Sequence, residues 1–290
     1  MGLHDLLISP FAEFAFMRRA LAGSIALAIA GPPLGVFLIL RRMALTGDAV
    51  GHAILPGAAI GYLAAGLSLG PMTMGGLAAG LLVAVGSGVV ARTTILREDT
   101  SLAAFYLISL ALGVTIVSLR GSNIDLLHVL FGSVLALDDA TLILLAAIAS
   151  VTLTALAALY RPLVLETVDP GFLASVSRSG GVVQITFFAL VVLNLVGGFQ
   201  ALGTLLAVGM MMLPAASAML MTTDMTLMIV AATAQGMFAG YAGLVISFHG
   251  GLPSGPLIIL VAGILYLLAL IFGPAGGLLR RFKPGRHLEA

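Results

Sequence analysis

Apolar residues along this chain are grouped into long runs, separated by short clusters of glycine, proline and charged residues. Each run holds about 20 residues, which as an α-helix is long enough to cross the roughly 30 Å of hydrocarbon in a bilayer. We place the runs at residues 16–40, 50–69, 72–91, 101–119, 139–160, 182–200, 203–221, 226–248 and 256–279. The pattern predicts an all-α, polytopic transmembrane helical bundle over residues 16–279, preceded by an N-terminal segment of residues 1–15.

Composition and charge support a membrane setting. The chain is 60% hydrophobic and 9% charged, and its mean hydropathy is +1.18, whereas soluble domains carry about 25% charged residues. It contains no cysteine, so it offers neither a disulfide framework nor a thiolate ligand. Any bound metal would be held by imidazole, carboxylate, thioether or carbonyl groups. The formal net charge of +1 argues against a nucleic-acid partner.

The basic residues indicate how the chain is oriented. With nine spans and an outer N-terminus, most of them fall on the cytoplasmic side, which is the bias that the positive-inside rule describes. The cytoplasmic set is Arg41, Arg42, Arg92, Arg97, Arg161, Arg178, Arg280, Arg281, Lys283 and Arg286, and the outer set is Arg18, Arg19 and Arg120. If segment 203–221 is instead re-entrant, eight spans remain and the N-terminus moves inside. Residues 280–290 form a basic cytoplasmic tail in both arrangements.

The first apolar segment has two interpretations. It follows Arg18 and Arg19 and contains the small residues around Ala28–Ala30, a combination that is also found in cleaved signal peptides. Apolar residues resume over 34–40, beyond the supposed cleavage point. This continuation favours a retained span, interrupted at Gly31–Pro33 because proline breaks the hydrogen-bond ladder of a helix.

One acid and one imidazole stand out in a chain that otherwise avoids charge. Asp48 and His52 are four positions apart, so in a helix they share one face, with Cβ atoms about 5–6 Å apart. Such a pair can hold one divalent cation, and two protein ligands leave the ion free enough to be released again. Imidazole with carboxylate suits zinc well and manganese or ferrous iron adequately. In the competing interpretation, Asp48 caps a helix and His52 is a buried, hydrogen-bonded histidine, although ionisable groups inside membranes are usually functional.

Three further polar residues are predicted on the outer side. Asp125 and His128 are three positions apart, and His249 precedes two glycines. They are candidates for an outer mouth, but each can equally be a surface group that hydrogen-bonds or faces water. We therefore predict their location and leave their role open.

The stretch from 161 to 181 predicts a short amphipathic helix over 169–178. Asp169 is suited to cap its start and Pro170 to occupy its first turn. The apolar residues Phe172, Leu173 and Val176 require a partner for the face that they form. The alternatives are a helix lying on the lipid surface and a helix docked into another protein.

Several separated motifs resemble those of one known family. The Arg-Arg-Met-Ala run of 41–44, followed by Gly47, Asp48, His52 and the Pro-Gly pair of 56–57, resembles the opening motif of the permease subunits of zinc, manganese and iron ABC importers, the ABC-3 family. The further similar motifs, in the same order, are Glu98-Asp99-Thr100, the Leu-Phe-Gly segment of 130–135, the proline-alanine motif of 213–218 and the turn at 253–256. The resemblance covers about residues 16–279.

The resemblance implies a homodimeric permease in the bacterial inner membrane. It implies a periplasmic metal-binding protein that delivers the ion and two copies of a separate ATPase subunit. The helix over 169–178 is then similar to a coupling helix that docks on that ATPase, with Asp169, Phe172, Leu173 and Val176 as its contacts, although Gly180 and Gly181 depart from the usual pattern. Asp48 and His52 would coordinate the transported metal, zinc first and manganese or iron next, during alternating access.

The sequence agrees that the energy source lies elsewhere. Lys283 is its single lysine, and no glycine-rich loop ends in Lys followed by Ser or Thr, so this chain has no P-loop for ATP. We expect a transport subunit that is not itself an enzyme and carries no cofactor. The open alternatives are a related permease for cobalamin or a siderophore, which would not need Asp48 and His52, and a proton-coupled secondary metal carrier. A metalloprotease is disfavoured because no His-Glu-x-x-His pattern occurs.

Overall fold

The computed structural model describes residues 7–66, 68–95, 98–119, 134–169, 172 and 180–279, and in these residues all regular structure is helical. The elements are α2 (Ser9–Glu13), α3 (Ala15–Leu40), α4 (Ala44–Ala53), α5 (Leu55–Ala65), α6 (Leu69–Thr93), α7 (Glu98–Leu119), the 3-10 turn η1 (Val134–Ala136), α9 (Asp139–Val168), α11 (Gly180–Leu202), α12 (Thr204–Met221), α13 (Met225–Gly250) and α14 (Ser254–Phe272). The expected all-α transmembrane bundle is confirmed.

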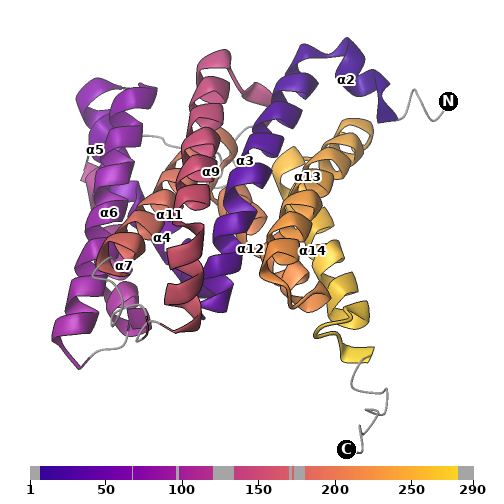
Figure 1. Cartoon of the computed structure of the whole chain (residues 1–290). Helices are drawn as coiled ribbons and strands as arrows, with labels where there is room; N and C mark the ends of the chain where they lie inside the picture. The colour runs from indigo at the N-terminus through magenta and orange to yellow at the C-terminus, as the bar shows by residue number, and fades with distance from the viewer. Residues whose placement is uncertain are drawn as a thin grey trace, which may run out of the picture.

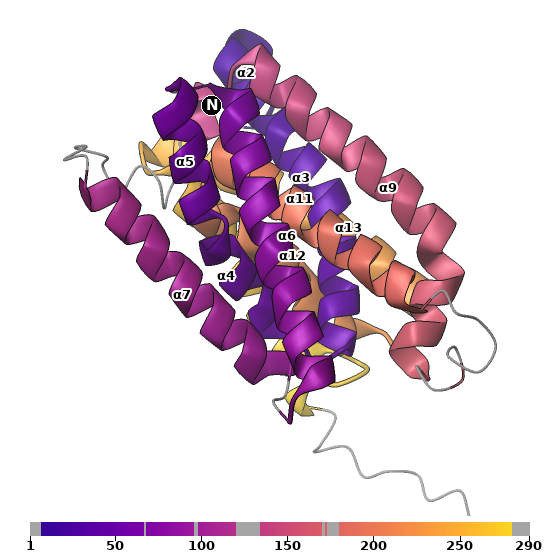
Figure 2. The same ribbon diagram turned by 90° about the vertical axis from the view of Figure 1, so that its left-hand side faces the viewer.

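The bundle is organised around α3, α11 and α12. Figure 1 shows α5, α6 and α7 on one side of these helices and α13 and α14 on the other. Figure 2 shows α7 and α9 along opposite edges. In the most apolar part of α3, 72% of the residues are buried, against 28% for α14 and α9. The central position of α3 follows from its small residues, which let neighbouring helices approach closely where lipid supplies no hydrophobic drive for association.

The helix lengths support nine crossings. Among the residues that the structure describes, seven helices are long and apolar enough to span a bilayer, namely α3, α6, α9, α11, α12, α13 and α14. In addition, α7 holds a shorter apolar stretch at Thr100–Gly113, and α4 and α5 follow one another as a broken pair. The segment that was a candidate for re-entry is α12, whose 18 residues extend about 27 Å. Because α2 and the end of α14 lie at opposite ends of the bundle (Figure 1), an odd number of crossings fits better than eight.

Helix α3 differs from expectation because it is not interrupted. It runs for 26 residues through Gly31, Pro32 and Pro33, all of which are buried. Pro32 lies against α13, where a Cβ added to Gly236 would be 3.2 Å from the proline Cγ. Proline is tolerated inside membrane helices when neighbouring helices enclose the irregular turn. The predicted interruption was therefore wrong, and the retained span is continuous.

Two other boundaries differ from the apolar pattern. The run predicted from residue 50 begins at Ala44 and is broken at Ile54. Pro56 explains the break, because it has no amide to donate to the carbonyl of His52 one turn earlier. Helix α9 continues past its predicted end at 160 to Val168. Leu163 in this extension is fully buried in the bundle, so Arg161 and Pro162 do not end the helix.

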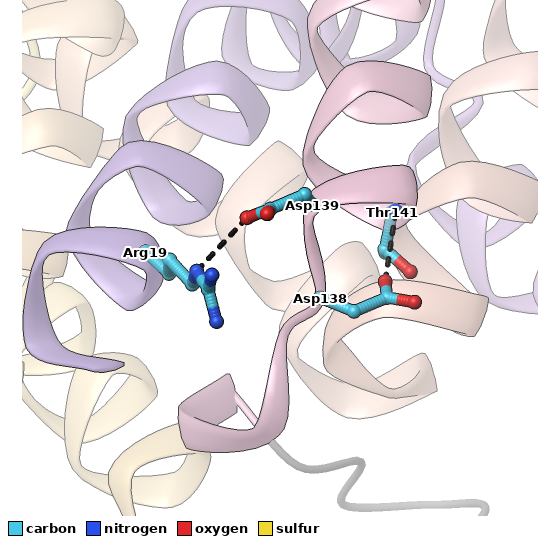
Figure 3. Close-up of polar contacts among 4 residues, drawn as sticks. All are labelled: Arg19, Asp138, Asp139 and Thr141. Atoms are coloured by element: carbon cyan, nitrogen blue, oxygen red, sulfur yellow. Dashed lines mark hydrogen bonds and ion pairs between the residues drawn. The ribbon is translucent and has the colours of Figure 1, made fainter. Parts of the chain in front are cut away.

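The N-terminal ends of α3 and α9 are joined by an ion pair (Figure 3). Arg19 Nε lies 3.0 Å from Asp139 Oδ1. The preceding residue, Asp138, caps α9 by accepting a hydrogen bond of 2.9 Å from the Thr141 amide. Hydrogen bonds from Thr141, first from its hydroxyl and then from its amide, lower the pKa of the Asp138 carboxyl, with a smaller contribution from Arg19. This ion pair and cap hold the N-terminal ends of α3 and α9 together.

Candidate functional site

Asp48 and His52 lie on one face of α4. His52 Nε2 is 3.6 Å from Asp48 Oδ1, and the two side chains are 30% and 67% exposed, respectively. The spacing of four residues has therefore brought the imidazole and the carboxylate together, as expected for a helix. The two groups are close enough to bind the same small cation after modest side-chain rotation.

A second face of α4, which carries Gly47 and Gly51, packs against α12. A Cβ added to Gly47 would lie 2.6 Å from Met212 Cε and 2.9 Å from Met211 Cε, and one added to Gly51 would lie 3.4 Å from Val208. Met211 is 1% exposed, so its side chain fills the gap between the helices. Glycine at both positions brings α4 against α12 and leaves the acid and the histidine on a different face.

Helix α7 contacts α4 at the level of the histidine and the helix break. The ring centroids of His52 and Tyr106 are 6.2 Å apart. One turn further along α7, the buried hydroxyl of Ser109 donates a 2.9 Å hydrogen bond to the carbonyl of Ala53. This bond satisfies a backbone oxygen next to the break that Pro56 causes, because an unpaired carbonyl at this depth is costly. Tyr106 and Ser109 could not be identified from the sequence, since nothing in the local pattern of α7 indicates its partner.

The arrangement offers two metal ligands rather than a closed site. In the described parts of the chain, no group of three or more His, Asp and Glu side chains could hold a metal ion. An acid and an imidazole leave most of the coordination shell to water, to backbone oxygens or to another chain. Such a shell is suited to transient binding.

The other predicted polar residues do not join this pair. Asp125 and His128 lie outside the described residues. His249 lies in the last turn of α13, where its Nδ1 is 2.9 Å from the carbonyl oxygen of Val245 and its ring meets Phe248 edge-on at 5.4 Å. Its predicted location on the outer side and its role both stay predictions.

The predicted helix over 169–178 is described only at its start. Asp169 follows α9 directly, and its Oδ1 accepts a 2.9 Å hydrogen bond from the Phe172 amide, which is the bond expected from a helix cap. Phe172 is 52% exposed. Leu173 and Val176 lie outside the described residues, so the apolar face that they would complete stays a prediction.

Sequence comparisons place the chain among transport proteins. The family model of the ABC 3 transport family matches residues 13–273. The chain is 32% identical to the manganese transport system membrane protein MntC of Halalkalibacterium halodurans, over 96% of this chain and 94% of that protein. It is 30% identical to the manganese import system permease protein ScaB of Streptococcus parasanguinis, over 90% and 92%, and 30% identical to a Haemophilus influenzae protein named as a probable iron transport system membrane protein, over 96% and 97%.

Solved structures agree with this placement. The chain superposes on PsaBC from Streptococcus pneumoniae, solved in complex with a Fab, with a TM-score of 0.84 and 28% identity, over 97% of this chain and 100% of that one. A metal-chelate type ABC transporter in an inward-facing conformation gives a TM-score of 0.65 at 15% identity, over 87% and 85%, and shows a shared fold alone. The seven candidate spans and the family match make this a multi-pass plasma-membrane protein. With motifs, fold and family model in agreement over nearly its whole length, the chain belongs to the ABC 3 transport family.

Proposed function

We propose that this chain is the permease subunit of an ATP-driven importer for a divalent transition-metal ion, with Asp48 and His52 as transient ligands in alternating access. The observation that carries the proposal is the 3.6 Å approach of the two side chains on α4. Relatives named for manganese and iron transport support the substrate class.

The exposure of Asp48 supports a homodimer. Along α4, Asp48 and His52 lie about 6 and 12 Å from the first residue of the helix, which places them within the span that α4 and α5 form. A carboxylate that is 67% exposed on a single chain cannot face lipid at this depth without a large desolvation cost. A second copy of the chain, packed so that the α4 faces border a shared water-filled path, removes that cost and completes the coordination of the metal.

Among the metals, we propose manganese as the first substrate to test. Carboxylate and water oxygens suit Mn²⁺, and a single imidazole is compatible with it. The pair alone does not separate manganese from zinc or iron, because all three accept these ligands. The two relatives named for manganese support this order, whereas zinc, which the ligand chemistry alone favoured, stays a prediction.

The remaining partners follow from the same proposal. ATP hydrolysis belongs to a separate ATPase subunit, which docks at the helix over 169–178 through Asp169, Phe172, Leu173 and Val176. A periplasmic binding protein delivers the ion to the outer ends of the helices. Replacing both Phe172 and Leu173 by alanine should release the ATPase and abolish transport. Retained association and uptake in this variant would reject the docking role.

Asp48→Asn and His52→Gln provide the main test, because each keeps the size of the side chain and removes a metal ligand. We expect Mn²⁺ uptake by the reconstituted transporter to fall at least tenfold in both, since even groups that only support a ligand change metal affinity by about 10–100-fold. The matched control is Asp224→Asn, at a helix cap that asparagine also fills. Wild-type uptake by both site variants would overturn the proposed site.

The same vesicles separate the competing functions. Uptake should require ATP and the ATPase subunit and should persist when the proton gradient is collapsed. Uptake driven by a proton gradient without ATP would identify a secondary carrier. ATP-driven uptake of cobalamin or a ferric siderophore, with free Mn²⁺ and Zn²⁺ excluded, would identify the related type of permease instead.

A further inference from the structure

The inner ends of α3 and α9 are joined by one arginine. Arg41 directly follows α3, and its Nε donates a 3.2 Å hydrogen bond to the hydroxyl of Thr167 in the last turn of α9. Two residues later, Asp169 accepts the hydrogen bond from the Phe172 amide. Arg41 therefore contacts α9 next to the segment where the proposed ATPase contact begins. The two partners are 126 positions apart in the chain.

The same arginine begins a tight turn into the metal-binding helix. The amide of Arg42 bonds to the carbonyl of Ile39 at 2.9 Å, and the amide of Met43 bonds to that of Leu38 at 2.8 Å, which is the hydrogen-bond pattern of a Schellman motif. Arg42 has a φ of 61°, the left-handed conformation that this motif requires. Helix α4 starts at Ala44. Only three residues separate the two helices, and all three belong to this motif. A displacement of the end of α3 is therefore transmitted almost unchanged to α4.

A third helix fixes the guanidinium in place. Arg41 Cζ lies 4.9 Å from the centroid of the Phe187 ring on α11, and Phe187 is fully buried. That ring also meets Phe37 at 6.1 Å, and Phe37 in turn meets Tyr160 of α9 edge-on at 6.4 Å. A planar guanidinium can stack on a ring and direct its Nε–H to a hydroxyl at the same time, whereas a lysine ammonium provides neither the plane nor the fixed donor direction.

We propose that Arg41 is a positioning residue that transmits movement of the inner end of α9 to α4, and thereby couples ATP hydrolysis to the opening and closing of the metal path at Asp48 and His52. This inference rests on the proposed function. The contact runs from the end of α9, through Thr167 and Arg41, to the turn from which the metal-binding helix begins. A purely structural link would change stability, whereas a transmitting link changes how many ions move for each ATP that is hydrolysed.

Two conservative substitutions remove the hydrogen bond between Arg41 and Thr167, and each has a matched control. Arg41→Lys keeps the charge but loses the planar donor, and Thr167→Val keeps the shape but loses the accepting hydroxyl. The controls are Arg161→Lys, an exposed arginine on α9, and Thr154→Val, an exposed threonine whose hydroxyl bonds within α9 to the carbonyl of Ser150 at 2.8 Å. The complete transporter, with its ATPase and binding protein, is reconstituted in vesicles, and Mn²⁺ uptake and ATP hydrolysis are measured on the same sample.

We expect the two test variants to retain ATP hydrolysis while the uptake per ATP falls about fivefold or more, the lower end of typical coupling between sites. The double variant should lose little more than the stronger single variant, because both remove the same contact. Both controls should keep the wild-type ratio, and Mn²⁺ binding to the isolated permease should be unchanged in all variants.

Two results would overturn the proposal. One is a wild-type ratio in both test variants; the other is a parallel fall of hydrolysis and uptake, which indicates a structural role only. Asp48→Asn, measured beside them, separates the two levels of inference. If Asp48→Asn abolishes uptake while Arg41→Lys keeps the wild-type uptake per ATP, the coupling role of Arg41 fails and the proposed function stands. If Asp48→Asn and His52→Gln both transport normally, the proposed metal site fails first.

Discussion

Gly57 of α5 and Gly75 of α6 form a backbone contact that a single methyl group should break. A Cβ added to Gly75 would overlap the carbonyl oxygen of Gly57 and lie 2.9 Å from its carbonyl carbon, and a Cβ added to Gly57 would in turn overlap the carbonyl oxygen of Gly75. These neighbours are backbone atoms, which cannot rotate away as the end of a side chain can. Gly75→Ala therefore requires α5, which follows α4 directly, to move away from α6.

Two opposing effects set the size of the change. Overpacking a closely packed contact costs about 1–3 kcal/mol, and a clash with backbone on the facing helix belongs at the upper end. Alanine regains roughly 0.8–1.0 kcal/mol of helix propensity over glycine. Gly75→Ala should thus destabilise the protein by about 2 kcal/mol. Gly88, on the same helix, has no atom within 4 Å of an added Cβ, so Gly88→Ala should stabilise the protein by up to about 1 kcal/mol.

Thermal unfolding of the purified protein in one detergent, at one heating rate, measures the contrast. At roughly 2–4 °C per kcal/mol for a large chain, the apparent melting temperature should fall by about 4–8 °C in Gly75→Ala and rise by about 2–4 °C in Gly88→Ala. Gly57→Ala should resemble Gly75→Ala, and the double variant should cost less than the sum because both changes separate the same two helices. Equal shifts in Gly75→Ala and Gly88→Ala would refute the reasoning from close approach.

Three further predictions concern the cap of α9 and the break between α4 and α5. The lowered pKa of Asp138 contributes stability that is complete above the usual pKa of 3.8 and is lost as the pH falls toward the lowered value; in Asp138→Asn, acid titration of the melting temperature should be flatter. Ser109→Ala leaves the carbonyl of Ala53 without its donor from α7. It should lower the free energy of unfolding in detergent by about 0.6 kcal/mol, the average for hydrogen bonds between membrane helices, and by at most about 1.7 kcal/mol. Pro56→Ala supplies an amide that can donate a hydrogen bond to the carbonyl of His52, which is worth about 0.5–1.5 kcal/mol. This variant should have a higher melting temperature and slower Mn²⁺ uptake. Unchanged values of both would exclude a hinge at this position.

The spans could be predicted because a membrane-spanning helix requires a continuous apolar run of sufficient length, which is directly visible in the sequence. The predicted ranges 16–40 and 203–221 accordingly differ by one residue at the start, and agree at the end, with α3 (Ala15–Leu40) and α12 (Thr204–Met221). The break at Ile54 was missed because Ile54 and Leu55 are apolar and do not interrupt the run. Pro56 causes the break because it has no amide to donate to the carbonyl of His52. A hydropathy pattern does not record a missing backbone donor.

The candidate site could be predicted only as far as local geometry extends. Asp48 and His52 meet because helical periodicity alone brings residues four apart together, and the cap at Asp169 forms within three residues. Arg41 was visible only as a charge and as part of a motif, because its partner is 126 positions away. Contacts between helices depend on how the helices cross, which a single sequence does not encode in a readable local form.

The two ends of α4 differ in how they are held, and this difference suggests how the helix moves. At its N-terminal end, the Schellman turn at Arg42 joins it closely to α3. At its C-terminal end, the chain is broken at Ile54 and continues into α5, which is packed against α6 through the Gly57–Gly75 contact. If α3 moves the N-terminal end of α4, the break at Ile54 allows α4 to tilt while α5 stays against α6. In the proposed dimer, this tilt would change the distance between the two α4 faces that carry Asp48 and His52, while the two residues of each chain stay together. A bound ion would then keep its two proposed ligands while the path around it opens.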